Sequence, residues 1–123
     1  MNHLHFTGRL AKAPTLTGNG DKAYAKFTLI RNEYAGKGQA GDQLEKQVSI
    51  QFTAFRRKAE AIAEYCRKGD QLTILARVEN NNYQKDGVDH FDFSFVVDEF
   101  EFGAPGAEKR SELASRRHAD AQV

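Results

Sequence analysis

Three aromatic residues fall where a hydrophobic core cannot use them, and cations surround them. Phe55 ends a polar face of alternating residues, Tyr83 follows three asparagines, and Tyr34 precedes a glycine-rich segment. An exposed ring offers a surface on which an unpaired nucleobase can stack. Lysine and arginine neutralise phosphates and release counterions, which gives affinity without sequence preference. The combination predicts a surface for a single strand of nucleic acid.

The candidate phosphate-binding cations lie in the first two thirds of the chain. They are Arg9, Lys12, Lys26, Arg31, Arg56, Arg57, Arg77 and Lys85. The formal net charge is only +1, but residues 1–85 hold 14 Lys/Arg and 8 Asp/Glu, whereas residues 86–102 hold six acids and no Lys or Arg. A polyanion would therefore meet the surface that is built before residue 86.

Signals of an enzyme are missing from the sequence. The single cysteine, Cys66, falls on the apolar face of a predicted helix, where a small core residue is expected. His3 and His5 share a strand face but lack a third ligand, and His90 and His118 have no evident companions. The sequence thus predicts no catalytic residue, no metal and no cofactor.

The composition is that of one globular domain. Of 123 residues, 40% are hydrophobic and 28% charged, and no apolar run approaches the roughly 20 residues of a membrane span. No signal sequence is visible, and one cysteine excludes an internal disulfide framework. These features predict a cytoplasmic protein with no membrane partner.

Hydrophobic periodicity predicts the elements that must position these residues. Alternation with a period of two predicts strands over 3–10, 23–31, 47–55, 72–79 and 88–102, and apolar spacing of three to four predicts a helix over 56–68. Three strands, one helix and two further strands are typical of an all-β OB-fold, a five-stranded barrel with one α-helix between strands 3 and 4.

Local signals refine this outline. Gly8 indicates a bulge or close approach in the first strand, and Ala35–Asp42, with three glycines, is predicted to be a projecting flexible loop. Arg67 and Lys68 before Gly69 predict the end of the helix. Apolar parity shifts by one residue between Val97 and Phe100, which predicts a bulge there.

Over residues 2–102 the sequence resembles the bacterial single-stranded DNA-binding proteins. The resemblance rests chiefly on Phe52–Glu60 and on Ala63–Leu72, a strand ending in phenylalanine, then a helix, then a Tyr-x-Arg-Lys-Gly turn. It implies an OB-fold domain over 1–102 and a short, flexible or partly helical tail over 103–123. It also implies a homotetramer, or a dimer, that binds and protects single-stranded DNA during replication, recombination and repair.

The resemblance also implies roles for single residues. Phe55 matches the stacking phenylalanine of the family, Tyr83 matches a position usually held by a stacking tryptophan, and Tyr34 lies within a residue of another. The remaining tryptophan position falls at Ser49, so one stacking surface is lost. The residue after the phenylalanine is commonly glycine and here is Arg56.

The last residues depart from the family pattern. Family members usually end in an acidic tip that recruits replication and repair enzymes, whereas this sequence ends Arg-Arg-His-Ala-Asp-Ala-Gln-Val over 116–123. Recruitment by that route is therefore not expected. This ending indicates a specialised member from a phage, plasmid or conjugative element. When bound to DNA, a protein of this family is expected to be associated with the nucleoid.

Three other interpretations remain open at this point. A primosomal, restart-type relative would share the fold but act as a bridge between replication proteins. A protein-interaction barrel would use the exposed rings as its contact surface. A nuclease would need a metal-binding carboxylate cluster, which the sequence does not display.

Overall fold

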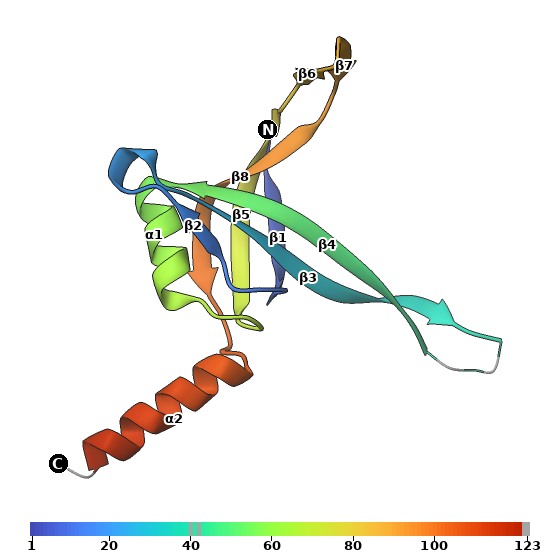
Figure 1. The fold of residues 1–123 in the computed structure, drawn as a ribbon. Helices are drawn as coiled ribbons and strands as arrows, with labels where there is room; N and C mark the ends of the chain where they lie inside the picture. The colour runs from blue at the N-terminus through green and yellow to red at the C-terminus, as the bar shows by residue number, and fades with distance from the viewer. Residues whose placement is uncertain (40, 42, 122–123) are drawn as a thin grey trace.

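A closed β-barrel forms the body of the molecule in the computed structural model, which describes residues 1–39, 41 and 43–121. Its strands are β1 (Leu4–Leu10), β3 (Tyr24–Lys37), β4 (Gln43–Phe55), β5 (Gln71–Asn80) and β8 (Phe93–Phe102). They follow the order β1-β5-β8-β4-β3, and a β1–β3 pairing closes the ring (Figure 1). The helix α1 (Arg56–Tyr65) joins the third and fourth of these strands. The predicted five-stranded OB-fold barrel is confirmed.

Smaller elements surround the barrel. A short strand, β2 (Thr15–Thr17), adds to the edge of β3, and a 3-10 turn, η1 (Gly20–Lys22), follows it. The strands β6 (Tyr83–Lys85) and β7 (Val88–His90) make a separate two-stranded sheet. The helix α2 (Ala107–Ala121) extends from the end of β8, away from the barrel (Figure 1).

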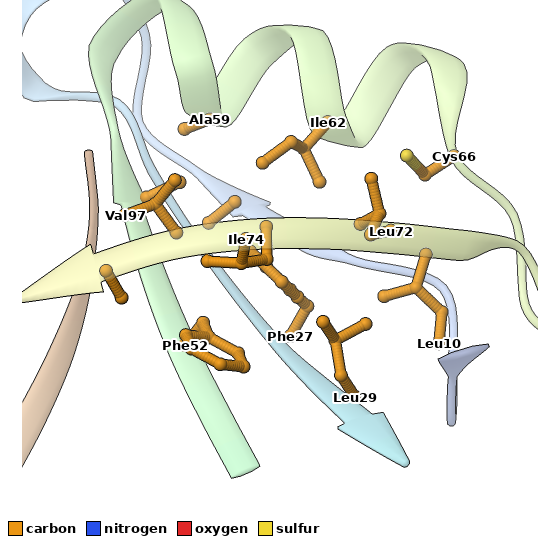
Figure 2. Close-up of a cluster of buried hydrophobic side chains, with 13 residues drawn as sticks. Leu10, Phe27, Leu29, Phe52, Ala59, Ile62, Cys66, Leu72, Ile74 and Val97 are labelled. Carbon is orange, nitrogen blue, oxygen red and sulfur yellow. The ribbon is translucent and has the colours of Figure 1, made fainter. Parts of the chain in front are cut away.

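The core explains why the predicted alternation was reliable. Every second residue of a barrel strand points inward, so Phe27, Phe52 and Ile74 are buried while their neighbours along the chain are not. The ring of Phe52 lies 5.8 Å from that of Phe27, measured between centroids. Ile62 and the other buried residues of α1 face β5 and close one side of the core (Figure 2).

Two local predictions are confirmed by the backbone. A Cβ atom at Gly8 would lie 2.8 Å from the carbonyl oxygen of Ile30, so the close approach of β1 and β3 requires glycine there. Leu75 pairs with Glu99, whereas Ala76 pairs with Val97. The residue between them, Asp98, is the extra residue of the bulge that the parity shift predicted.

The predicted end of the first helix was wrong. The helix α1 ends at Tyr65, and Cys66 already has an extended backbone, with φ −103° and ψ 143°. The N–H group of Arg67 donates to the carboxylate Oδ2 of Asp70 at 2.8 Å, which takes the place of a further helical hydrogen bond. Gly69 does have a positive φ of 88°, but it lies in a turn beyond the helix.

The glycine-rich segment is shorter as a loop than predicted. Strand β3 continues through Lys37 and β4 begins at Gln43, so the two form a long hairpin that projects from the barrel (Figure 1). Gly36 has φ 106° and lies where the β3–β4 register shifts, so β3 continues beyond this irregularity to Lys37. Residues 40 and 42 of the predicted loop, and residues 122–123 of the predicted tail, lie outside the described part.

The predicted strand over 88–102 is two strands. Strand β7 ends at His90 and pairs with β6, whereas β8 begins at Phe93 and pairs with β5 and β4. The exchange of partners occurs at Asp92, whose side chain accepts the N–H group of Phe93 at 2.8 Å.

The segment predicted as a tail contains α2, whose beginning contacts the end of α1 and the turn that precedes β5. The N–H group of Gly106 donates to Oδ1 of the buried Asp70 at 2.7 Å. Lys109 Nζ donates to the carbonyl oxygen of Tyr65, and Arg67 forms an ion pair with Glu112 at 3.2 Å.

Candidate nucleic-acid interface

The hairpin of β3 and β4 carries two of the three predicted rings on one outward face. Residues paired across neighbouring strands share a face, and Tyr24 pairs with Phe55, Lys26 with Thr53, and Tyr34 with Glu45. Phe55 is 46% and Tyr34 62% exposed. We call this face the platform. It comprises the even residues of 24–34 and the odd residues of 45–55.

The two rings stand far apart along the platform. Glu45, opposite Tyr34, is about ten residues from Phe55 along β4, which corresponds to about 30 Å at the usual strand rise. The outward residues between them are polar or aliphatic, among them Lys26, Ser49 and Gln51. A single strand lying along this face would therefore pass several nucleotides between one ring and the other.

Cations gather beside Phe55 because β4 leads directly into α1. Arg56, Arg57 and Lys58 line a hollow of about 460 Å³ together with Phe55, and two acids, Asp21 and Glu60, lie in the same lining. Arg56 has φ 59°, the left-handed conformation that glycine adopts most easily, and its N–H group donates to the carbonyl oxygen of Ala23 at 2.8 Å. Arginine therefore occupies a position whose backbone favours glycine.

Tyr83 lies on the separate β6–β7 hairpin and is 49% exposed. Its ring is stacked on that of His90, with the centroids 4.9 Å apart and an interplanar angle of 10°. Sequence reasoning looked for metal ligands beside His90 and missed this aromatic neighbour. The signal was available, because the turn at Asp86–Gly87 places Tyr83 opposite His90 when residues are counted outward from it. Lys85 borders the same turn.

A groove separates the platform from the start of β8. It has a volume of about 280 Å³ and contains Phe93, which is 64% exposed. The alternation that predicts a strand over 88–102 gives Phe93 the same parity as Phe95 and Val97, whose side chains are packed against the core. That reasoning missed its exposure because Phe93 lies at the rim of the barrel, opposite Asn80 at the end of β5.

Three of the predicted cations have partners within the protein. Arg9 Nη1 donates to the carbonyl oxygen of Gly69 at 2.9 Å. Arg31 lies on the side of β3 opposite to the platform, and its Nε atom is 3.4 Å from Oε1 of Glu33. Arg77 Nε donates to Oε1 of Glu79 at 2.8 Å, and Arg77 Nη1 donates to Asp98. These hydrogen bonds, chiefly the one that Glu79 accepts, raise the pKa of the Arg77 guanidinium above its ordinary value.

Lys12, Lys26, Arg56, Arg57 and Lys85 are exposed. Lys26 lies on the platform, and Arg56 and Arg57 lie beside Phe55. Lys12 lies between β1 and β2, and Lys85 lies on the hairpin. The structure thus brings three cations to the Phe55 half of the platform and distributes the others around it.

Groups that could perform covalent chemistry are not assembled in the described part of the chain. Cys66 is buried, and that burial, followed by the negative charge of Asp70, raises the pKa of the thiol to about 11. The thiol is therefore protonated at neutral pH. Among the side chains that the structure describes, which exclude, among others, those of residues 117–123, no three of His, Cys, Asp or Glu meet as metal ligands. No helix in the described part of the chain has the length and hydrophobicity of a membrane span.

Comparison with known proteins identifies the family. Residues 1–103 match the Single-strand binding protein family. A "Single-stranded DNA-binding protein" of Clostridium perfringens (strain 13 / Type A) is 34% identical over 94% of this chain and 76% of its own length. A second, from Fusobacterium nucleatum, is 29% identical over 84% of this chain and 67% of its own.

A solved structure shares the fold. The "Plasmodium falciparum SSB complex with ssDNA" superposes with a TM-score of 0.69 at 16% identity, covering 84% of this chain and 95% of that one. The family match spans residues 1–103 and so includes the whole barrel, which shows that the chain belongs to the single-strand binding protein family.

Proposed function

We propose that this protein binds single-stranded DNA without sequence preference and protects it during replication, recombination and repair. The observation that carries the proposal is the platform, which presents Phe55 and Tyr34 to solvent on one strand face with Lys26 between them. Bases stack on the rings and cations neutralise the phosphates, and neither contact depends on base identity. The protein acts by binding and not by catalysis.

The DNA-binding domain is residues 1–102, and residues 103–123 form an appended segment. Phe55, Tyr34 and Tyr83 stack bases in this proposal, with Lys12, Lys26, Arg56, Arg57 and Lys85 along the phosphates. Arg9, Arg31 and Arg77 join them by exchanging a carbonyl or carboxylate partner for a phosphate. The cytoplasm is the proposed location, at the nucleoid when DNA is bound.

A homotetramer is the proposed assembly, with a dimer as its simpler form. Strand β1 pairs along Leu4–Arg9 with β5 but with β3 only at Arg9 and Leu10. The other edge of Leu4–Gly8 has no strand partner in the described residues, and an open edge of this kind can pair with a second copy. Light scattering of the DNA-free protein would give the subunit number.

Binding assays with three nucleic acids test the central proposal. The wild-type protein should retard single-stranded DNA but not duplex DNA of equal length, and single-stranded RNA serves as the comparison for sugar preference. Its affinity should fall as salt is raised, because phosphate contacts release counterions. An affinity that does not change with salt would contradict phosphate contact.

A double variant tests the stacking residues. Phe55→Ala with Tyr83→Ala should weaken binding of oligo-dT by a few kcal/mol, since each stacked base contributes about 1–3 kcal/mol. Leu44→Ala is the matched control, because Leu44 is an exposed apolar residue of β4 on the face opposite to the platform. Unchanged affinity in the double variant would remove both rings from the site.

A further inference from the structure

The groove between the platform and the start of β8 has the features of a site of its own. Its volume is about 280 Å³. The residues that line it include Lys26, Ser49, Gln51, Asn81, Asp92 and Phe93. One wall is therefore the middle of the platform, and the other is the rim of the barrel where β5 and β8 meet.

The aromatic member of the groove is fixed in place through its backbone. Phe93 pairs with Asn80 of β5, and its N–H group donates to Oδ1 of Asp92 at 2.8 Å. The carbonyl oxygen of Asp92 in turn accepts the N–H group of Asn81 at 2.8 Å. A ring that is 64% exposed is thus attached to an ordered backbone, which limits the conformational entropy that a ligand must remove.

Comparison with Phe95, two residues along the strand, shows that the core does not require an aromatic ring at position 93. Phe95 has the same parity but packs on Phe52 of the core, with the ring centroids 6.2 Å apart. Because Phe93 lies one step further toward the rim, no core remains for it to cover. The barrel would tolerate a polar residue there.

The polar groups of the groove suit a nucleobase better than a phosphate. Ser49, Gln51 and Asn81 supply hydroxyl and amide groups that can both donate and accept hydrogen bonds. Among the lining residues, Lys26 is the one cation and Asp92 the one carboxylate, so their charges balance. Base edges present donors and acceptors without net charge, whereas a phosphate requires excess positive charge.

The position of the groove fits the spacing of the platform. Ser49 is six residues from Phe55 along β4, about 20 Å at the usual strand rise, and therefore lies within the interval of about 30 Å that separates Phe55 from the row of Tyr34. The outward residues of that interval include no aromatic side chain. Phe93 reaches the interval from a different strand.

We propose that this groove is a nucleobase site, in which one base of the bound single strand stacks on Phe93 while Ser49 and Gln51 face its edge. The proposal rests on the proposed function, single-stranded DNA binding. It assigns to Phe93 a contact that a strand lying on β3 and β4 alone could not make. Lys26, at the side of the groove, would meet the adjoining phosphate.

A tryptophan reporter tests the contact directly, because the chain contains no tryptophan. Phe93→Trp would be the only such residue, and stacking of a base of oligo-dT on it should strongly quench its emission. Phe91→Trp is the matched control, since Phe91 is 79% exposed but does not line the groove. Its emission should change little, and equal quenching at both positions, or none at Phe93→Trp, would overturn the proposal.

Affinity supplies the second measurement. Phe93→Ala should weaken oligo-dT binding between about 5-fold and 150-fold, the range of one stacked base, and Phe91→Ala should leave it unchanged. If the wild-type protein binds oligo-dT and Phe93→Ala binds equally well, the nucleobase site is wrong while the proposed function stands. If the wild-type protein does not bind oligo-dT at all, the proposed function itself fails.

Contact with a second copy is the other use that an exposed ring could serve. In that case Phe93→Trp would emit at short wavelength before DNA is added and would not be quenched. Light scattering of Phe93→Ala would also show fewer subunits than the wild type. These results would overturn the proposal, whereas an unchanged subunit number with reduced affinity and quenched Phe93→Trp would support it.

Discussion

Phe55 and Tyr83 are both half-exposed rings, but the strands that carry them are supported differently. Phe55 ends a strand that is paired with β3 on one side and β8 on the other, and the preceding Ala54 is fully buried. Tyr83 belongs to a three-residue strand in a sheet of two, and one face of its ring lies against His90.

The difference indicates how each ring would meet a ligand. The position of Phe55 is fixed when the barrel folds, so little order remains to be gained on binding. The hairpin depends on its turn and on one stacked pair, and such an element opens locally at small free energy. We therefore expect the platform to set the affinity and the hairpin to adjust to the bound strand.

The largest expected effect concerns the core beneath the platform. Phe52→Ala should lower the free energy of unfolding by about 3–5 kcal/mol, because it leaves a cavity where four strands contribute rings. Urea denaturation measures this change. Phe91→Ala, which removes an equally large but exposed ring, should remain within about 0.5 kcal/mol of the wild type. Similar losses in both variants would contradict the dependence of the platform on the core.

The next effect compares the two rings as ligands for DNA. Phe55→Ala should weaken oligo-dT binding by about 1–3 kcal/mol, the value of a stacked base on a fixed ring. Tyr83→Ala should weaken it less, because a base would have to use the remaining face of Tyr83 or displace His90. Fluorescence anisotropy of a labelled oligonucleotide measures both, and a larger loss at Tyr83 would reverse the proposed ranking.

The difference between core-supported and separate elements explains which features the sequence could predict. The alternation of Ile50, Phe52 and Ala54 shows that one side of a strand is covered, and this pattern predicted the barrel strands. The shift of parity before Phe100 located the bulge for the same reason. Both signals are local consequences of a shared core.

Features that depend on a partner distant in sequence were missed. Phe93 keeps the parity of the buried residues, and only the pairing with Asn80 shows that it lies beyond the core. The early end of the helix has a local cause instead, because Asp70, three residues further on, accepts the N–H group of Arg67, a contact that propensity does not reveal. Of the site, the exposure of Phe55, Tyr34 and Tyr83 was predictable, whereas their contact with DNA remains a prediction.

A smaller effect is expected from the turn of the hairpin. Asp86 and Gly87 have φ values of 54° and 77°, and no atom lies within 4 Å of a Cβ placed at Gly87. Gly87→Ala should therefore destabilise only the turn, by about 1–2 kcal/mol of backbone strain. Hydrogen exchange should become faster for Tyr83–His90 and stay unchanged in the barrel. Faster exchange throughout β5 and β8 would show that the hairpin is not independent.

The smallest effect is expected beside Phe55, where one substitution should act differently at two adjacent arginines. Arg56 has φ 59°, so Arg56→Gly relieves backbone strain of about 1 kcal/mol. Glycine also raises the conformational entropy of the unfolded chain, which lowers the stability by a comparable amount. The net change in stability should be under about 1 kcal/mol. Arg57 lies within α1, where glycine costs about 1 kcal/mol with no strain to relieve.

Arg56→Gly should consequently unfold at a higher urea concentration than Arg57→Gly, although each variant loses one cation beside Phe55. Equal midpoints would contradict a strained backbone at Arg56. The DNA measurement separates stability from binding, because the loss of one phosphate contact to single-stranded DNA lowers the slope of log affinity against log salt by about 0.7. If Arg56→Gly keeps its stability but its affinity depends less steeply on salt, arginine is retained at a glycine-favouring position because its charge meets the DNA.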